Sequence, residues 1–127
     1  MEHAIELFVA INYTVTGLSH LLQRRGWVEF FVWLRSKGHT GVFFNGMLSL
    51  GFGSLIVAFH NVWTGLPIVV TIIGWANVLK ALVIMSAPEL GMRSLNRVSV
   101  ERAGEFPAAG AGLLVLAAVV WYLVITR

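Results

Sequence analysis

The stretch AAGAGLLVLAAVVWYLVI, which covers residues 108–125, has no charged or strongly polar side chain. A helix of about 20 apolar residues crosses the roughly 30 Å hydrocarbon core of a bilayer, so this stretch predicts a transmembrane helix. Three other apolar stretches of similar length run over about residues 4–22, 41–59 and 66–85. Inside lipid, backbone polar groups must be hydrogen-bonded within their own segment, which favours a helix in all four. The sequence therefore predicts an all-α integral membrane four-helix bundle, with one transmembrane domain over residues 1–127.

The composition of the 127 residues agrees with this location. Hydrophobic residues make up 57% of the chain and charged residues 12%, and the mean hydropathy is +0.81. A soluble domain of this length could not keep so much apolar surface away from water. The chain has no Cys, which excludes a disulfide scaffold and a cysteine-based metal site, and its apolar content excludes a disordered tail.

Basic residues lie mainly in two of the three connections between the predicted spans. These residues are Arg24, Arg25, Arg35 and Lys37 in the first connection and Arg93, Arg97 and Arg102 in the third. The turn over residues 61–65 has neither Lys nor Arg. By the positive-inside bias, both basic connections are expected in the cytoplasm and both termini outside, in a bacterial inner membrane. We expect the cations to contact anionic lipid headgroups, and we expect no nucleic-acid partner because no such binding motif is present.

The first basic connection has an amphipathic pattern over about residues 25–37. Its large apolar residues are spaced i, i+3, i+4 and i+7, and they are Trp27, Phe30, Phe31 and Leu34. Arg25, Glu29 and Ser36 take the opposite face. This pattern predicts an interfacial helix with its rings at the acyl boundary.

A weak internal repeat links the first and third predicted spans. The segment Thr14–Gln23 aligns without gaps with Thr71–Lys80, so that Gly17 matches Gly74. Both segments are expected to run from outside to inside, and a basic connection and a returning helix follow each. The pattern predicts two parallel hairpins related by an axis along the membrane normal.

Polar residues inside the spans partly share helix faces and suggest a strip through the bundle. The candidates for this strip are Asn12, Thr16, His20, Asn45, Ser49, Asn77 and Lys80. Glu6 and His60 fall at similar depth near the outside, where they would form an outer mouth. His20, Asn45 and Lys80 fall at similar depth near the cytoplasm, on three different helices.

Two interpretations of this strip remain open. In the first, the polar groups hold helices together through hydrogen bonds worth about 0.6 kcal/mol each, and Lys80 extends its long stem to the headgroups. In the second, the groups line a water-filled pathway, and Lys80 and Asn77 form an anion or proton site.

Catalytic, metal and cofactor sites are not expected. The sequence has no Gly-rich phosphate loop and no Ser–His–acid set that the predicted topology brings together. His20 and His60 should lie about a membrane thickness apart, which argues against a shared haem iron or metal ion. A cofactor carrier in which one of them binds haem separately is the weaker alternative.

The run His60-Asn61-Val62-Trp63, followed by Thr71, Gly74-Trp75, Lys80 and Pro88, resembles a pattern in small four-span bacterial inner-membrane proteins with no assigned activity. This resemblance covers roughly the middle third of the chain. It implies the four-span architecture and no substrate or site.

Two function classes follow from the sequence. The first is a non-enzymatic structural or accessory membrane protein, and the second is a small channel or transporter. Four helices alone enclose little room for a pathway, so the second class would require a homo-oligomer. A larger membrane complex is the other expected assembly.

Overall fold

A computed structural model describes residues 2–97 and 104–126 of the chain. Its helices are α1 (Glu2–Leu22), α2 (Arg24–Ser36), α3 (His39–Phe59), α4 (Ile68–Ser86), α5 (Pro88–Asn96) and α6 (Glu105–Thr126). Helices α1, α3, α4 and α6 are long and apolar enough to cross a membrane, as expected of a multi-pass membrane protein. They begin and end within three residues of the predicted spans, so the all-α four-span prediction is confirmed.

The connections end the helices where the sequence supplies turn residues. Gly38, between α2 and α3, has a φ of 61°, and Gly65, before α4, has a φ of 71°. Both angles lie in the left-handed region that residues with a Cβ disfavour. Proline at the start of α5 costs no hydrogen bond, because the first amides of a helix have no partner within it.

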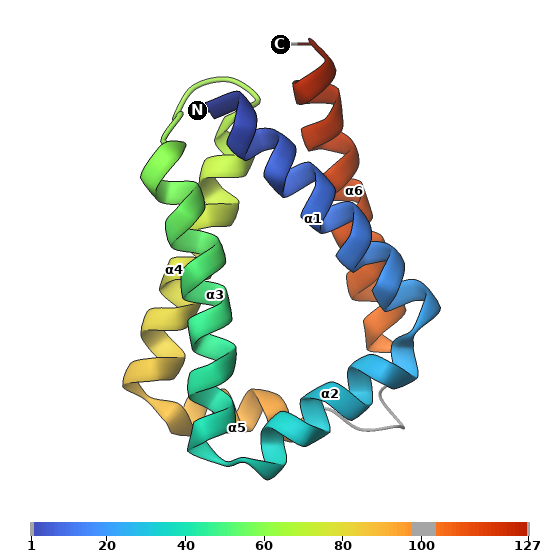
Figure 1. Cartoon of the computed structure of the whole chain (residues 1–127), viewed down its shortest axis with the longest axis vertical. Helices are drawn as coiled ribbons and strands as arrows, with labels where there is room; N and C mark the ends of the chain where they lie inside the picture. The colour runs from blue at the N-terminus through green and yellow to red at the C-terminus, as the bar shows by residue number, and fades with distance from the viewer. Residues whose placement is uncertain (1, 98–103, 127) are drawn as a thin grey trace.

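The four long helices form two antiparallel pairs, α1 with α6 and α3 with α4 (Figure 1). The pairs approach each other at the end that carries Glu2 and the turn before α4, and they diverge toward the opposite end. We call the first the terminal end, because Thr126 also lies there. The wide end, where α2 and α5 lie across the opening, is the basic end.

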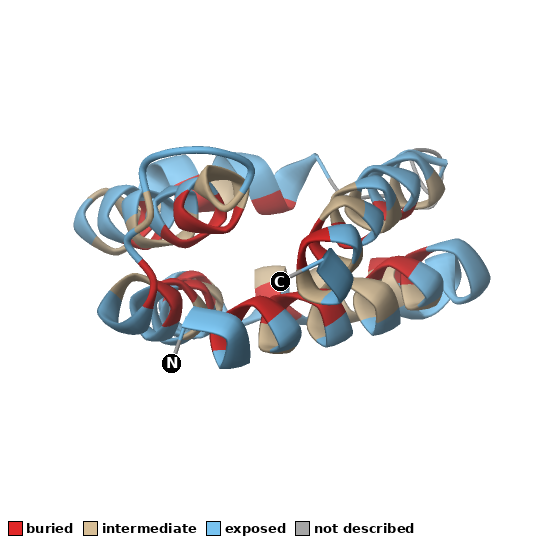
Figure 2. Cartoon of the chain, turned by 90° about the horizontal axis from the view of Figure 1, so that it is seen from above, coloured by how far each residue is buried: buried red, intermediate tan, exposed pale blue. Residues whose placement is uncertain are grey.

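Seen from the terminal end, the buried residues lie on the helix faces that meet within a pair or between the pairs (Figure 2). The core of the terminal end contains Ile5, Val9, Ala10, Ile56, Val70, Ile73, Val120 and Leu123. The outward faces carry large apolar side chains such as Val15, Met47 and Val115, each more than 60% exposed. Apolar residues on the outside are what a lipid solvent requires.

The amphipathic helix between the first two spans is confirmed as α2. Trp27 stacks on His20 of α1 with 4.1 Å between ring centroids, and Phe31 stacks on Phe106 of α6 at 5.7 Å. These two rings therefore pack against the long helices at the wide end of the molecule, and the expected contact of the aromatic face with the acyl boundary stays a prediction.

Glycines set the close approach of the helices in both pairs. A Cβ on Gly110 of α6 would lie 2.7 Å from the carbonyl oxygen of Gly17 and 2.8 Å from the Cβ of His20. A Cβ on Gly53 of α3 would lie 2.7 Å from the carbonyl oxygen of Gly74 and 2.8 Å from the Cβ of Asn77. Small residues at such positions let membrane helices pack backbone to backbone.

The two sets of contacts are equivalent, because each residue of one set lies 57 positions from its counterpart in the other. The matched positions are 17 and 74, 20 and 77, and 53 and 110. The same offset relates Thr14–Gln23 to Thr71–Lys80. The structure therefore supports the repeat, with α1–α3 as one copy and α4–α6 as the other.

The predicted pairing within each copy is wrong, although the copies run parallel. Helix α1 packs against α6 and α3 packs against α4, so each pair combines helices from both copies. The reason is that the glycines on α1 and α4 face α6 and α3. The two copies are thereby interlocked.

Candidate functional site

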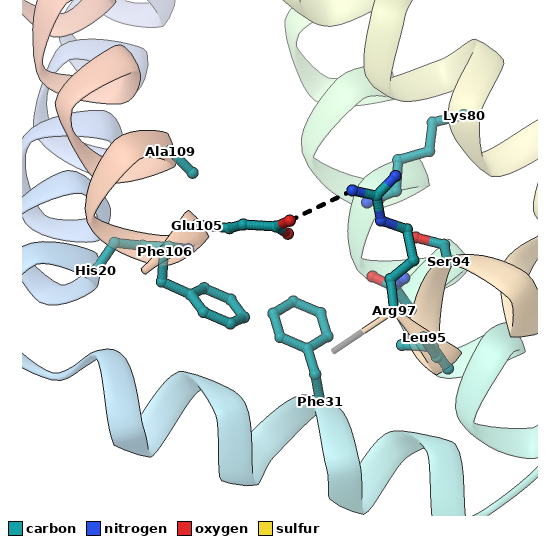
Figure 3. Close-up of a pocket in the computed structure, with 10 residues that line it drawn as sticks. His20, Phe31, Lys80, Ser94, Leu95, Arg97, Glu105, Phe106 and Ala109 are labelled. Atoms are coloured by element: carbon teal, nitrogen blue, oxygen red, sulfur yellow. Dashed lines mark hydrogen bonds and ion pairs between the residues drawn. The ribbon is translucent and has the colours of Figure 1, made fainter. Parts of the chain in front are cut away.

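A polar cavity of about 300 Å³ lies between the helix pairs at the basic end (Figure 3). We call it the basic cavity. All of α1 to α6 contribute to its lining, which consists of His20, Phe31, Asn45, Lys80, Ser94, Leu95, Arg97, Glu105, Phe106 and Ala109. The cavity exists because the helix pairs diverge at this end and α2 and α5 cover the opening without filling it.

Three residues of the predicted polar strip meet in this cavity. His20, Asn45 and Lys80, which the sequence placed at similar depth on three helices, all belong to its lining. Sequence reasoning missed Ser94 and Glu105. Their positions depend on α5 and on the start of α6, which no local pattern relates to α1 or α4.

Lys80 is the lining cation that lacks a carboxylate partner. Within residues 2–97 and 104–126 its ammonium makes no hydrogen bond or ion pair. The side chains of Asn45 and Ser94 likewise have no hydrogen-bonding partner among those residues. Lys80 and Ser94 are exposed and Asn45 is half-buried, so water or a ligand in the cavity can reach these unpartnered groups.

The imidazole of His20 is held in one orientation. Its Nδ1 lies 2.8 Å from the carbonyl oxygen of Thr16, and a carbonyl only accepts, so Nδ1 carries the proton. The ring is stacked on Trp27, whose Nε1 donates to the Ser19 hydroxyl at 2.9 Å. The other nitrogen, Nε2, is therefore the one that remains for a ligand.

An ion pair links α5 to α6 beside the cavity. Glu105 reaches from α6 toward Arg97, and its Oε1 lies 3.3 Å from the guanidinium (Figure 3). The two side chains are 57% and 66% exposed, so solvent screens the pair and its contribution to stability is small. An anion in the cavity can therefore compete with Glu105 for Arg97 at little cost.

At the terminal end, Glu6, His60 and Thr71 form a closed hydrogen-bonded network. His60 Nε2 lies 3.1 Å from Glu6 Oε1, and Nδ1 lies 3.0 Å from Thr71 Oγ1. All three residues are fully buried. Glu6 and His60 do meet, as their similar depth suggested, and they are buried beside the start of α1. The outer mouth expected from them stays a prediction.

The network also determines its proton content. The Thr71 hydroxyl donates to the carbonyl of Val62 at 2.8 Å, so it accepts from His60 Nδ1. Because Nδ1 already carries a proton, the hydrogen bond between Nε2 and Oε1 requires one further proton, which is shared by the imidazole of His60 and the carboxyl of Glu6. The pair is then neutral overall, which suits a buried position.

This arrangement is a Thr–His–Glu set, which the sequence analysis did not expect the topology to assemble. The Thr71 hydroxyl is not positioned as a nucleophile, because it is fully buried and donates its hydrogen bond to the Val62 carbonyl oxygen. Both ring nitrogens of His60 are also engaged, so neither has a lone pair to offer a haem iron. The network is best explained as a structural link between α1, α3 and α4.

The remaining members of the predicted strip do not form a continuous polar route. The side chains of Asn12 and Asn77 donate to carbonyls of their own helices, those of Phe8 and Ile73, and Asn77 also hydrogen-bonds the Tyr13 hydroxyl of α1. Ser49 is buried. The ring centroid of Phe52 in α3 lies 5.4 Å from that of Phe8 and 5.8 Å from that of Tyr13, both in α1. We call these three rings the aromatic layer; along the helices they lie between the residues of the basic cavity and those of the terminal network. Thr16 contributes its carbonyl to His20.

The other cations of the predicted headgroup set lie at the basic end. Arg24, Arg25 and Arg93 are exposed on α2 and α5, and Arg35 lies in the last turn of α2. The ammonium of Lys37 lies 5.6 Å from the ring centroid of Trp33. Arg102 lies outside the described residues. Among the described residues, no group of three His or acidic side chains forms a metal site.

Comparison with known proteins assigns no family, since no protein-family model, curated protein or solved structure matches the chain. The resemblance of its middle third to small four-span inner-membrane proteins therefore stays a prediction. The function has to be argued from the site itself.

Proposed function

We propose that this chain is a non-enzymatic multi-pass membrane protein that binds a phosphate-like anion in the basic cavity. The observation that carries the proposal is Lys80, whose ammonium lines the cavity with no ionic or hydrogen-bonding partner among the described residues. A lysine at the centre of a transmembrane helix costs about 2.5–3.5 kcal/mol by insertion scales unless it is compensated, and the cost is smaller for Lys80, six residues before the end of α4. An anion in the cavity supplies that compensation.

The other lining groups support an oxyanion ligand. The Arg97 guanidinium offers paired donors that match phosphate geometry, and the Asn45 amide and Ser94 hydroxyl offer further donors. Among the described lining residues, Lys80 and Arg97 carry positive charge and Glu105 alone carries negative charge, so the lining has a net positive charge. No nucleophile of this lining has a base within hydrogen-bonding distance, which supports binding without catalysis.

A phosphate-like group can reach this site from two sources, a lipid headgroup or a free phosphate in solution. The basic end carries the cation-rich connections, so the positive-inside bias supports placing it at the cytoplasmic face of a bacterial inner membrane. Cations there favour anionic headgroups as partners. An accessory role in such a membrane, as a homo-oligomer or within a larger complex, agrees with this proposal.

A transporter is the second candidate, supported by one specific observation. Parallel repeats that meet at a binding site are a feature of several transporter folds, and here both copies contribute to the basic cavity. Transport would require the aromatic layer around Phe52 and the network around His60 to open. In the present conformation both are packed, which disfavours a permanently open channel.

Thermal unfolding of the detergent-purified protein tests the proposal. The probes are inorganic phosphate and a short-chain phosphatidic acid, each compared with chloride at equal ionic strength. A ligand at 100 times its Kd stabilises the folded state by about 2.7 kcal/mol, which raises Tm by several degrees. Stabilisation by phosphatidic acid alone identifies a headgroup, and stabilisation by phosphate as well identifies the free anion.

Substitutions at Lys80 provide the control. Lys80→Gln should abolish the shift in Tm that inorganic phosphate produces, and Lys80→Arg should keep most of it because the charge remains. Gln23→Lys is the matched variant for the phosphate probe, since it places a lysine at the equivalent position of the other copy, outside the described lining of the basic cavity. If neither probe raises Tm, or if Lys80→Gln responds to phosphate as the unsubstituted protein does, the proposal is wrong.

A further inference from the structure

A second opening lies between α1 and α3 on the side of α2. It has a volume of about 540 Å³ and is lined by Ser19, Gln23, Gly26, Trp27, Phe30 and Leu48. We call it the apolar groove. For comparison, a cavity of about 150 Å³ lined by apolar side chains is large enough to bind benzene.

The repeat relates this groove to the basic cavity. Gln23 and Leu48 line the groove, and the residues 57 positions further along, Lys80 and Glu105, line the basic cavity. Equivalent positions of the two copies therefore line two different openings, although the basic cavity also takes His20, Phe31 and Asn45 from the first copy. In the second copy these positions carry a cation and a carboxylate, whereas in the first they carry a neutral amide and a leucine.

The apolar groove extends from the boundary of the membrane into its core. Gln23 lies between α1 and α2, at the basic end. Leu48 lies nine residues beyond the start of α3, which corresponds to about 14 Å along the helix. The neighbouring side chains Leu22 and Met47 are 75% and 62% exposed on the outward surface. The groove is thus continuous with the surface that faces lipid.

Cations stand at the boundary end of the groove. Arg24 and Arg25 are exposed at the start of α2, between Gln23 and Gly26 of the groove lining. Arg25 takes the helix face opposite Trp27 and Phe30, so Arg24 is the arginine nearer to the groove. Among the described residues, neither arginine has a carboxylate partner. Arginine is well suited to bind a phosphodiester, because its planar donors match the phosphate oxygens.

We propose that the apolar groove binds one acyl chain of an anionic phospholipid, whose phosphate is held by Arg24. The chain lies against Trp27, Phe30 and Leu48, and the headgroup remains at the level of α2. The hydrogen bond from Trp27 to Ser19 holds one wall of the groove in place before the lipid binds. This site is separate from the basic cavity, and it does not depend on the function proposed for that cavity.

Gly26 offers a way to block the groove without harming the fold. A Cβ built on Gly26 has only one neighbour within 4 Å, the Cβ of Gln23 at 3.9 Å. A leucine there would fill the groove and would also favour the helix, since leucine is a better helix former than glycine. Gly51→Leu is the matched control, because Gly51 is an exposed helical glycine with nothing within 4 Å and does not line the groove.

Native mass spectrometry of the full chain, with dioleoyl phosphatidylglycerol and dioleoyl phosphatidylcholine as probes, tests the inference. We expect one phosphatidylglycerol to be retained in preference to phosphatidylcholine. Gly26→Leu should weaken its binding at least tenfold, and Gly51→Leu should leave it unchanged. Arg24→Gln should remove the preference for phosphatidylglycerol, and Arg25→Gln, on the opposite face of α2, should leave it unchanged.

Lys80→Gln distinguishes this site from the basic cavity. The inference predicts that this variant retains phosphatidylglycerol as the unsubstituted protein does, whatever its response to phosphate. If the lipid is lost in Lys80→Gln and kept in Gly26→Leu, it binds in the basic cavity and the inference is wrong. Equal retention of the two lipids by the unsubstituted protein would also overturn it.

Discussion

The buried network at the terminal end makes a sharp prediction for Thr71→Val. The Thr71 hydroxyl makes three hydrogen bonds, at 3.0 Å with His60 Nδ1 and at 3.0 and 2.8 Å with the backbone N–H and C=O of Val62. Valine has nearly the same shape and can make none of them. The substitution therefore removes the bonding without creating a large cavity.

The expected loss follows from what each partner leaves unsatisfied. A fully buried donor such as His60 Nδ1 costs about 1–3 kcal/mol when its acceptor is removed. The Val62 groups are half-buried, so water replaces part of their bonding, and they add about 0.5–1.5 kcal/mol. We expect Thr71→Val to lower the free energy of unfolding by about 2–4 kcal/mol.

The equivalent threonine of the other copy is the control. Thr14 accepts one hydrogen bond from another helix, from Trp121 Nε1 at 2.9 Å, and donates to the Ala10 carbonyl of its own helix. Such an interhelical bond is worth about 0.6 kcal/mol on average, so Thr14→Val should cost less than 1 kcal/mol. Equilibrium unfolding in mixed micelles, followed by circular dichroism, measures both variants. Equal losses, or a loss below about 1 kcal/mol for Thr71→Val, would refute the reasoning.

Three further predictions concern helix packing, the ion pair and the depth of the cavity. Gly53→Ala should lower the free energy of unfolding by about 1–3 kcal/mol in the same assay, because its Cβ would lie 2.7 Å from a backbone carbonyl of α4. Gly51→Ala should leave the free energy of unfolding unchanged or raise it slightly, and equal losses in the two variants would contradict the packing. Glu105→Gln should change stability by less than about 1 kcal/mol and strengthen phosphate binding, since the carboxylate no longer competes for the guanidinium; weaker binding would contradict this. In this cysteine-free chain, Asn45→Cys should react with a membrane-impermeant maleimide from the basic end and Ser49→Cys should not, and labelling of both would reveal a deeper water path.

The basic cavity shows which parts of a site a sequence can reveal. His20, Asn45 and Lys80 were found because the depth of a residue in the membrane follows from its position within a span. The partners from α5 and α6 were not found, because their place depends on which helices pack together. A glycine at the same offset in both copies was a usable signal for that packing, and it lay in Gly53 and Gly110.

The terminal network shows what the sequence could not reveal about a site. Matching depth correctly suggested that Glu6 and His60 lie near each other, but it left open whether they face water or protein. That depends on how the start of α1 packs beside the ends of α3 and α4, which the local pattern of side chains does not encode. The helix pairs diverge from there toward the basic end, where Trp27 of α2 stacks on His20.

The sequence by itself determined the four spans, the helix at the interface and the repeat, because transfer of a segment into lipid depends on the local run of side chains. Only the tertiary structure decided that α1 pairs with α6 and α3 with α4, that Glu6, His60 and Thr71 form a buried network, and that His20, Asn45 and Lys80 share one cavity. The physical reason is that helix pairing in a membrane is set by backbone contacts between residues far apart in the chain. At Gly17 and Gly110, and again at Gly53 and Gly74, these contacts are too close for a side chain to intervene.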